Sequence, residues 1–85
     1  MSDEFQTAVK KNIDRTRRTD AINQLQAYDE RTNLALLVRT GGLAGEFRRQ
    51  ALEALIESGA TAHLESISED RSVPPSLRRR AEEAV

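Results

Sequence analysis

A repeat of 30 residues is the feature that most constrains how this chain folds. When residues 17–55 are laid over residues 47–85 without a gap, nine of the 39 pairs are identical and five more exchange one large apolar residue for another. The matched positions are chiefly apolar residues and the arginines beside them, and they include Ala21, Ala51 and Ala81. A unit of this length holds two short helices and cannot bury its own apolar face, so its copies must stack on one another.

Apolar residues recur at helical spacing along the chain, and no segment alternates strictly between apolar and polar. Alanine, leucine, glutamate, glutamine and arginine are abundant, which favours helices over strands. We therefore predict an all-α fold of about six short helices in a stack of helical hairpins, with a compact irregular helical bundle as the alternative. The apolar stripes span residues 5–13, 21–28, 34–38, 47–55, 60–67 and 77–85.

Several residues are typical of helix boundaries. Serine and aspartate are expected as N-caps, glycine as the left-handed residue after a helix, and proline in a first turn. In this chain these residues are Ser2 and Asp29, Gly41-Gly42 and Gly59, and Pro74-Pro75. Because residues 14–20 contain neither glycine nor proline, a single long helix from Asp3 to Tyr28 stays open beside two separate helices.

The length of 85 residues suits one domain. The repeat divides it into a leading helix and linker, two repeats and a closing half-repeat. The expected boundaries are 1–16, 17–46, 47–76 and 77–85.

Residues 47–55 and 77–85 carry the clearest motif. The first segment reads Phe-Arg-Arg-Gln-Ala-Leu-Glu-Ala-Leu and the second reads Leu-Arg-Arg-Arg-Ala-Glu-Glu-Ala-Val. This pattern resembles the first helix of a HEAT-like repeat of the PBS-lyase type. The resemblance covers residues 17–85, with Arg17 in place of the leading apolar residue, and it implies a helical scaffold for protein interactions. Residues 70–81 also resemble a stretch in an uncharacterised family of short archaeal helical proteins, which implies no function.

Composition restricts the chemistry that the chain offers. Without cysteine there is no disulfide, thiolate nucleophile or cysteine-based zinc site, and the single His63 excludes a site that needs two imidazoles. We therefore predict no enzymatic activity, metal, cofactor or small-molecule substrate. No apolar run approaches the roughly 18 residues of a membrane span, so we expect a cytoplasmic protein with no membrane partner.

Arginine recurs every 30 residues, at Arg18, Arg48 and Arg78. On a helix whose buried face is centred on Ala51, Arg48 lies about 60° from that centre at roughly 100° per residue. We expect its stem to pack along the edge of the core and its guanidinium to meet an acid or a carbonyl of an adjacent helix. The neighbouring arginines point outward, toward acids four residues on. The pairs expected at this spacing are Arg49–Glu53, Arg78–Glu82 and Arg79–Glu83.

Two partner classes remain open, a protein and a nucleic acid. The segment before residue 20 carries a basic run opposed locally only by Asp14, but no aromatic residue lies between its cations to stack on bases. Val85 falls where Leu55 falls in the preceding unit, so we expect an apolar edge there that forms a homodimer or docks a protein. We predict a non-catalytic protein–protein interaction module or small scaffold. The alternative is a nucleic-acid-binding protein that uses this basic run and the basic stripe formed by the recurring arginines. The candidate partner-binding residues are Lys10, Lys11, Arg15, Arg18, Arg48, Arg49, Arg78, Arg79 and Val85.

Overall fold

The computed structural model describes residues 3–10 and 13–85, which form six α-helices and no strand. The prediction of an all-α fold with about six short helices is therefore confirmed. The helices are α1 (Asp3–Val9), α2 (Arg15–Ala27), α3 (Arg31–Val38), α4 (Gly45–Glu57), α5 (Thr61–Glu69) and α6 (Pro75–Glu83). Within the described ranges, every helix falls short of the length and apolar character that a membrane span needs.

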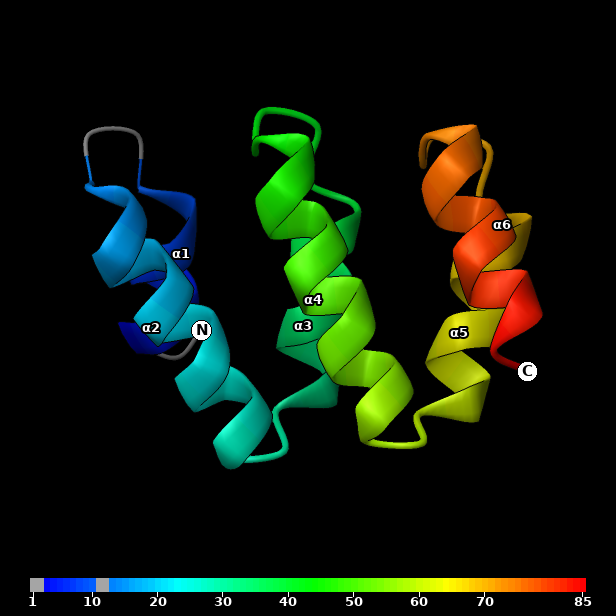
Figure 1. The fold of residues 1–85 in the computed structure, drawn as a ribbon, viewed down its shortest axis with the longest axis horizontal. Coiled ribbons are helices and arrows are strands. Elements are labelled where there is room, and N and C mark those ends of the chain that lie inside the picture. Colours follow the sequence, from blue (N-terminus) through cyan, green and yellow to red (C-terminus); the bar gives the residue numbers. More distant parts are fainter. Residues whose placement is uncertain (1–2, 11–12) are drawn as a thin grey trace.

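The helices pack as three hairpins that stand side by side (Figure 1). The closest neighbours are α1 with α2, α3 with α4, and α5 with α6. Adjacent hairpins meet through α2, α4 and α6 on one side of the stack and through α1, α3 and α5 on the other. A repeat can be divided at any point of its period. Because the closest pairs are α3 with α4 and α5 with α6, the structural hairpins begin at the starts of α3 and α5. These starts lie about half a repeat after the expected repeat starts at residues 17 and 47.

The core lies where the two helices of a hairpin meet each other and the next hairpin. The three alanines at equal spacing, Ala21, Ala51 and Ala81, occupy matching buried positions with 5%, 0% and 0% exposure. Small side chains at these positions let the paired helices approach closely. Larger apolar residues fill the space around them, each worth about 1.5–3 kcal/mol when fully buried. The fully buried set includes Ile22, Leu25, Leu34, Leu37, Leu52, Leu55 and Ile67.

The chain turns between α1 and α2, so the single long helix from Asp3 to Tyr28 is wrong. Asp14 explains the new start, because its carboxylate accepts a hydrogen bond of 2.8 Å from the backbone N–H of Arg17. An N-cap of this kind satisfies one of the donors that the first turn of a helix leaves free. The expected cap Ser2 lies outside the described residues.

Asp29 ends α2 and does not cap α3, contrary to expectation. It has a φ of 55°, and Gly59, at the same position of the next hairpin, has a φ of 68°. In both loops the following N–H reaches back to a leucine carbonyl, of Leu25 in the first and Leu55 in the second. This is the left-handed turn with which many helices end. Glu30 precedes α3 without a side-chain cap.

Gly59 takes the left-handed conformation that was predicted for it, whereas Gly41 and Gly42 do not. The turn after α3 is closed instead by the N–H of Thr40, which donates to Leu37 O. Pro75 is the first residue of α6, as expected, where its missing N–H removes no helical hydrogen bond.

Substitution of the two glycines tests this difference. Gly59→Ala should lower the free energy of unfolding by about 1 kcal/mol, because a left-handed residue with a Cβ is strained. Gly41→Ala is the matched control, since its added Cβ meets nothing within 4 Å and its φ is not positive. It should leave stability unchanged or raise it slightly. Urea unfolding followed by circular dichroism measures both, and equal losses would contradict the assignment.

Candidate functional site

The arginines that recur every 30 residues are turned into the stack. The Nε of Arg48 donates to the carbonyl of Val38 at 2.8 Å, and the Nε of Arg18 donates to the carbonyl of Ala8 at 2.9 Å. Arg48 is only 7% exposed. In each case the acceptor lies ten residues earlier, near the end of the hairpin's first helix, where carbonyls lack helical partners. The expected packed stem and carbonyl partner are thus observed at both positions.

Arg78 holds the same position in the third hairpin with a different outcome. Its Nε is buried and without a hydrogen-bond partner, and one terminal nitrogen of Arg48 is in the same condition. The carbonyl that the period would offer to Arg78 belongs to Ser68. Unpaired buried nitrogens are costly. The third hairpin is therefore less completely closed by its arginine than the first two.

The guanidinium groups of Arg15 and Arg18, both on α2, lie over the ring of Phe47 on α4. The Cζ atoms of the two guanidinium groups lie 5.6 Å and 5.1 Å from the ring centroid. Arg15 also forms an ion pair with Glu46 beside the ring. Cations over an aromatic face are attracted by its quadrupole. Arg15 therefore ties two hairpins together, a role that its place in the basic run did not indicate.

Polar ties between neighbouring hairpins recur at two sequence separations. Four of them join residues 31 positions apart, and three join residues 27 positions apart. Both separations follow from the period of 30. A residue meets the equivalent helix of the next hairpin either one position after its own counterpart or three positions before it. The first set is Arg15–Glu46, Thr19–Gln50, Gln26–Glu57 and Arg39–Asp70; the second is Asn23–Gln50, Arg39–Ser66 and Glu53–Arg80.

The ion pairs expected four residues apart on one helix are absent from the part of the chain that the structure describes. Glu53 binds Arg80 of the next hairpin through two hydrogen bonds of 2.8 Å and 3.0 Å, instead of Arg49 on its own helix. Arg49 and Arg79 are exposed and belong to none of the ion pairs among the described residues. Glu53 pairs with Arg80 because the two parallel N–H groups of that guanidinium match the two oxygens of the carboxylate.

Two carboxylates at these ties have lowered pKa values. The hydrogen bond from Arg80 lowers the pKa of Glu53 below its ordinary value of 4.5, against a smaller opposing effect of burial. The hydroxyl and the backbone N–H of Ser72 lower the pKa of Asp70 below 3.8, with help from Arg39. Both shifts favour the charged carboxylate in the folded chain.

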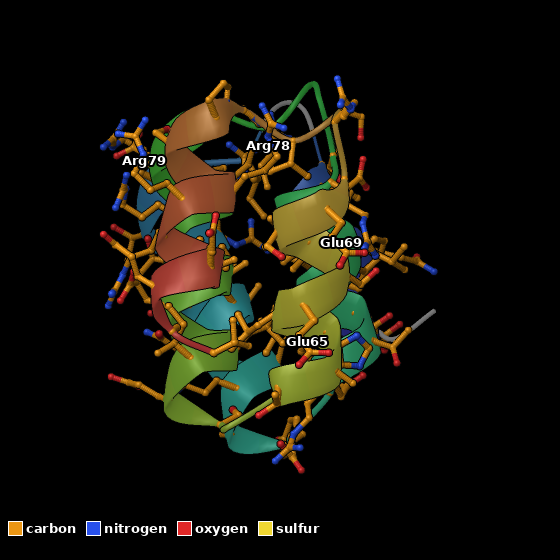
Figure 2. The ribbon with its side chains drawn as sticks, turned by 90° about the vertical axis from the view of Figure 1, so that its right-hand side faces the viewer. Glu65, Glu69, Arg78 and Arg79 are labelled. Atoms are coloured by element: carbon orange, nitrogen blue, oxygen red, sulfur yellow. The ribbon has the colours of Figure 1, made fainter. Side chains whose placement is uncertain are left out.

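The outer face of α5 and α6 is charged where inner hairpins are apolar (Figure 2). Glu65 occupies the position of the buried Ala35, and Glu82 occupies that of the buried Leu52. In Figure 2, Glu65 and Glu69 lie one above the other on α5, and Arg79 lies at the edge of α6 that is turned away from α5. The predicted apolar edge is therefore wrong. Val85 is 53% exposed, as expected, but the face that it adjoins carries charged side chains.

The opposite outer face, on α1 and α2, shows the same substitution of polar for apolar residues. Arg17 takes the position of Phe47, and Gln24 takes that of Ala54, both of which are buried in α4. A cavity of about 310 Å³ opens on this face. Its lining is Asp3, Glu4, Thr7, Arg17, Asp20, Ala21 and Gln24.

The remaining candidate residues lie apart from one another. Lys10 is exposed after α1, and Lys11 lies outside the described residues. The half-buried His63 stands on α5, and no group of three His, Cys, Asp or Glu among the described residues is arranged to hold a metal ion. The sequence does hold a signal for the two outer faces. It is the set of repeat positions at which a polar residue in one unit replaces an apolar residue in another.

The chain matches no family model, no curated protein and no solved structure.

The buried arginine gives a direct prediction about stability. Arg48→Ala should lower the free energy of unfolding by about 2 kcal/mol, because it removes a charged hydrogen bond to Val38 and leaves that carbonyl without its partner. Arg49→Ala, on the next residue of the same helix, should change it by less than about 0.5 kcal/mol. Urea unfolding of both variants measures the contrast, and equal effects would contradict an inward role for Arg48.

Acid should weaken the ties made by Glu53 and Asp70. A carboxylate whose pKa is lowered by folding stabilises the folded state above its ordinary pKa, and this contribution disappears as the pH falls through the lowered value. At pH 7, Glu53→Gln and Asp70→Asn should each lower the melting temperature by roughly 2–4 °C. The difference from the parent should shrink as the pH falls below about 4. Melting curves between pH 7 and pH 3 test this, and a difference that is constant with pH would contradict it.

Proposed function

We propose that the protein is a non-catalytic interaction module, a small cytoplasmic scaffold of helical hairpins that binds another protein through the outer face of α5 and α6. The observation that carries the proposal is that Glu65 and Glu82 stand at the positions of Ala35 and Leu52, which are buried in the central hairpin. Glu65, Glu69 and Arg79 belong to none of the ion pairs among the described residues, so their charges are available to a partner.

Two further considerations support an interaction role. The repeat over residues 17–85 resembles HEAT-like units, which serve mostly as scaffolds, and the stacked hairpins suit such a role. A cysteine-free chain also has no need of an oxidising compartment.

Nucleic-acid binding has less support. Arg18 and Arg48 direct their Nε atoms to backbone carbonyls, and Arg15 is paired with Glu46. These three cations belong to the basic run and the arginine stripe on which the nucleic-acid alternative rests. Arg49 and Arg79 remain exposed, but the chain as a whole carries 14 acidic and 13 basic residues, so it has no net positive charge to attract a polyanion.

Quantitative affinity capture with the full chain as bait tests the proposal. The variant Glu65→Lys/Glu69→Lys reverses the acidic side of the α5–α6 face and should lose a bound protein that the parent chain retains, by at least about tenfold in recovered amount. The control is Ala27→Lys/Thr32→Lys, which adds two positive charges at exposed residues away from that face and should retain the partner.

Circular dichroism establishes that both variants are folded before capture. Each recovered protein is then titrated, in purified form, against the parent and the two variants. Equal binding by all three chains, or equal loss in both variants, would contradict the α5–α6 face as the binding surface.

A further inference from the structure

We propose that the α5–α6 outer face receives the α1–α2 outer face of a second copy, so that chains associate head to tail and continue the stack of hairpins. This inference rests on the proposed function and names the partner as a second copy of the chain. It follows from the relation between hairpins within one chain, applied to the two faces that have no neighbouring hairpin among the described residues.

The separation of 31 residues predicts which charges would meet. Within the chain it joins Arg39 on α3 to Asp70 in the next hairpin, at 2.8 Å. Moved one hairpin further, the same relation places Glu69 opposite Lys10 of the second copy. In the inner pair the base lies on the earlier hairpin and the acid on the later one. In the proposed pair the acid lies on the earlier hairpin and the base on the later one, so the interaction is still attractive.

The same separation acts on the other side of the stack. There the side-chain Nε2 of Gln50 on α4 donates to the backbone carbonyl of Thr19 on α2, so the two positions lie next to each other. Carried to the second copy, the same separation places Asp20 opposite Arg79, which belongs to no ion pair among the described residues. The two separate helix layers thus both bring opposite charges together.

Buried apolar positions of the inner hairpins are also replaced by charges of opposite sign on the two outer faces. Leu52 of α4 and Leu77 of α6 are buried, at 0% and 4% exposure, on two helices of adjacent hairpins that contact each other. The equivalents of these two positions on the outer faces are Glu82 and Arg17. A hairpin that ends the stack in water needs only polar residues there. Opposite signs at the two matching positions are an additional feature, and a second copy makes use of them.

One pair opposes the association. The separation of 27 residues joins Glu53 to Arg80 inside the chain, and the same relation places Glu83 near Asp20 of the second copy. Two carboxylates would then share Arg79. The repulsion between them weakens the contact and provides a substitution that should strengthen it.

The contact joins two different faces, so it is heterologous and not two-fold symmetric. Exposed ion pairs are individually weak and are screened by salt. The association should therefore be reversible and favoured by low ionic strength.

Sedimentation equilibrium of the full chain, from about 10 µM to about 1 mM at roughly 20 mM salt, tests the inference. The parent should gain mass with concentration. Glu69→Lys and Lys10→Glu should each weaken association by about fivefold or more, because each makes an attractive pair repulsive. An equimolar mixture of these two variants should associate again, since the lysine introduced in one can face the glutamate introduced in the other, and the unchanged Glu69 and Lys10 can also meet. Glu83→Gln should strengthen association about two- to threefold.

Thr32→Lys and Thr32→Glu are the controls, because Thr32 is exposed on the central hairpin. Both should associate like the parent, which separates a local effect from one of net charge. A parent chain that stays monomeric up to about 1 mM would overturn the inference, as would a mixture that fails to recover. The proposed function would survive either result if capture still depends on Glu65 and Glu69, and it would fail separately if capture is unaffected by their reversal.

Discussion

The structure depends on apolar flanks that a pair of short helices leaves uncovered. Helices of 7 to 13 residues are marginal by themselves in water. A hairpin made of two such helices still exposes one side of each, and only another hairpin can cover it. The burial of Leu52 and Leu55 on α4 shows the solution, since one helix packs on its own hairpin partner and on the next hairpin at once. Each hairpin must therefore present apolar residues at the same positions to cover its neighbour, and this produces the period of 30 in the sequence.

The arginines at the hairpin loops show how an apparently basic stripe becomes internal. Arg48 stands about 60° from the centre of the buried face at roughly 100° per residue. Its long stem can cover apolar surface while the guanidinium caps the carbonyl of Val38 at the end of α3. Repetition therefore preserves a structural contact at Arg18 and Arg48. Arg49, which follows Arg48 in the chain, is exposed, whereas Thr19, which follows Arg18, is half-buried.

Helix content, the buried alanines and the inward arginines were predictable because they depend on spacing within one helix. The roles of Asp14 and Asp29 at helix boundaries were harder to predict. Either aspartate can cap a helix. Asp14 does so in an extended conformation, whereas Asp29 is left-handed and ends the preceding helix, and the packing of each loop decides between the two conformations. The partner of Glu53 was missed because Arg49 and Arg80 both lie within reach of it, and the choice depends on how α4 and α6 pack. The ring contact of Arg15 with Phe47 has the same origin, since it joins residues of two hairpins.

The two outer faces were missed for a different reason. Matching residues were used to find the repeat, whereas these faces are defined by mismatches such as Glu82 at the position of Leu52 and Arg17 at that of Phe47. In a stack, an inner position is constrained by the next hairpin, and an outer position is constrained only by what approaches it from outside. Water accepts any polar residue, so solvation alone explains that these positions are polar but leaves the sign of each charge undetermined. The opposite signs at Glu82 and Arg17, and at Glu69 and Lys10, are a second regularity beyond solvation, and it is this regularity that points to another copy of the chain.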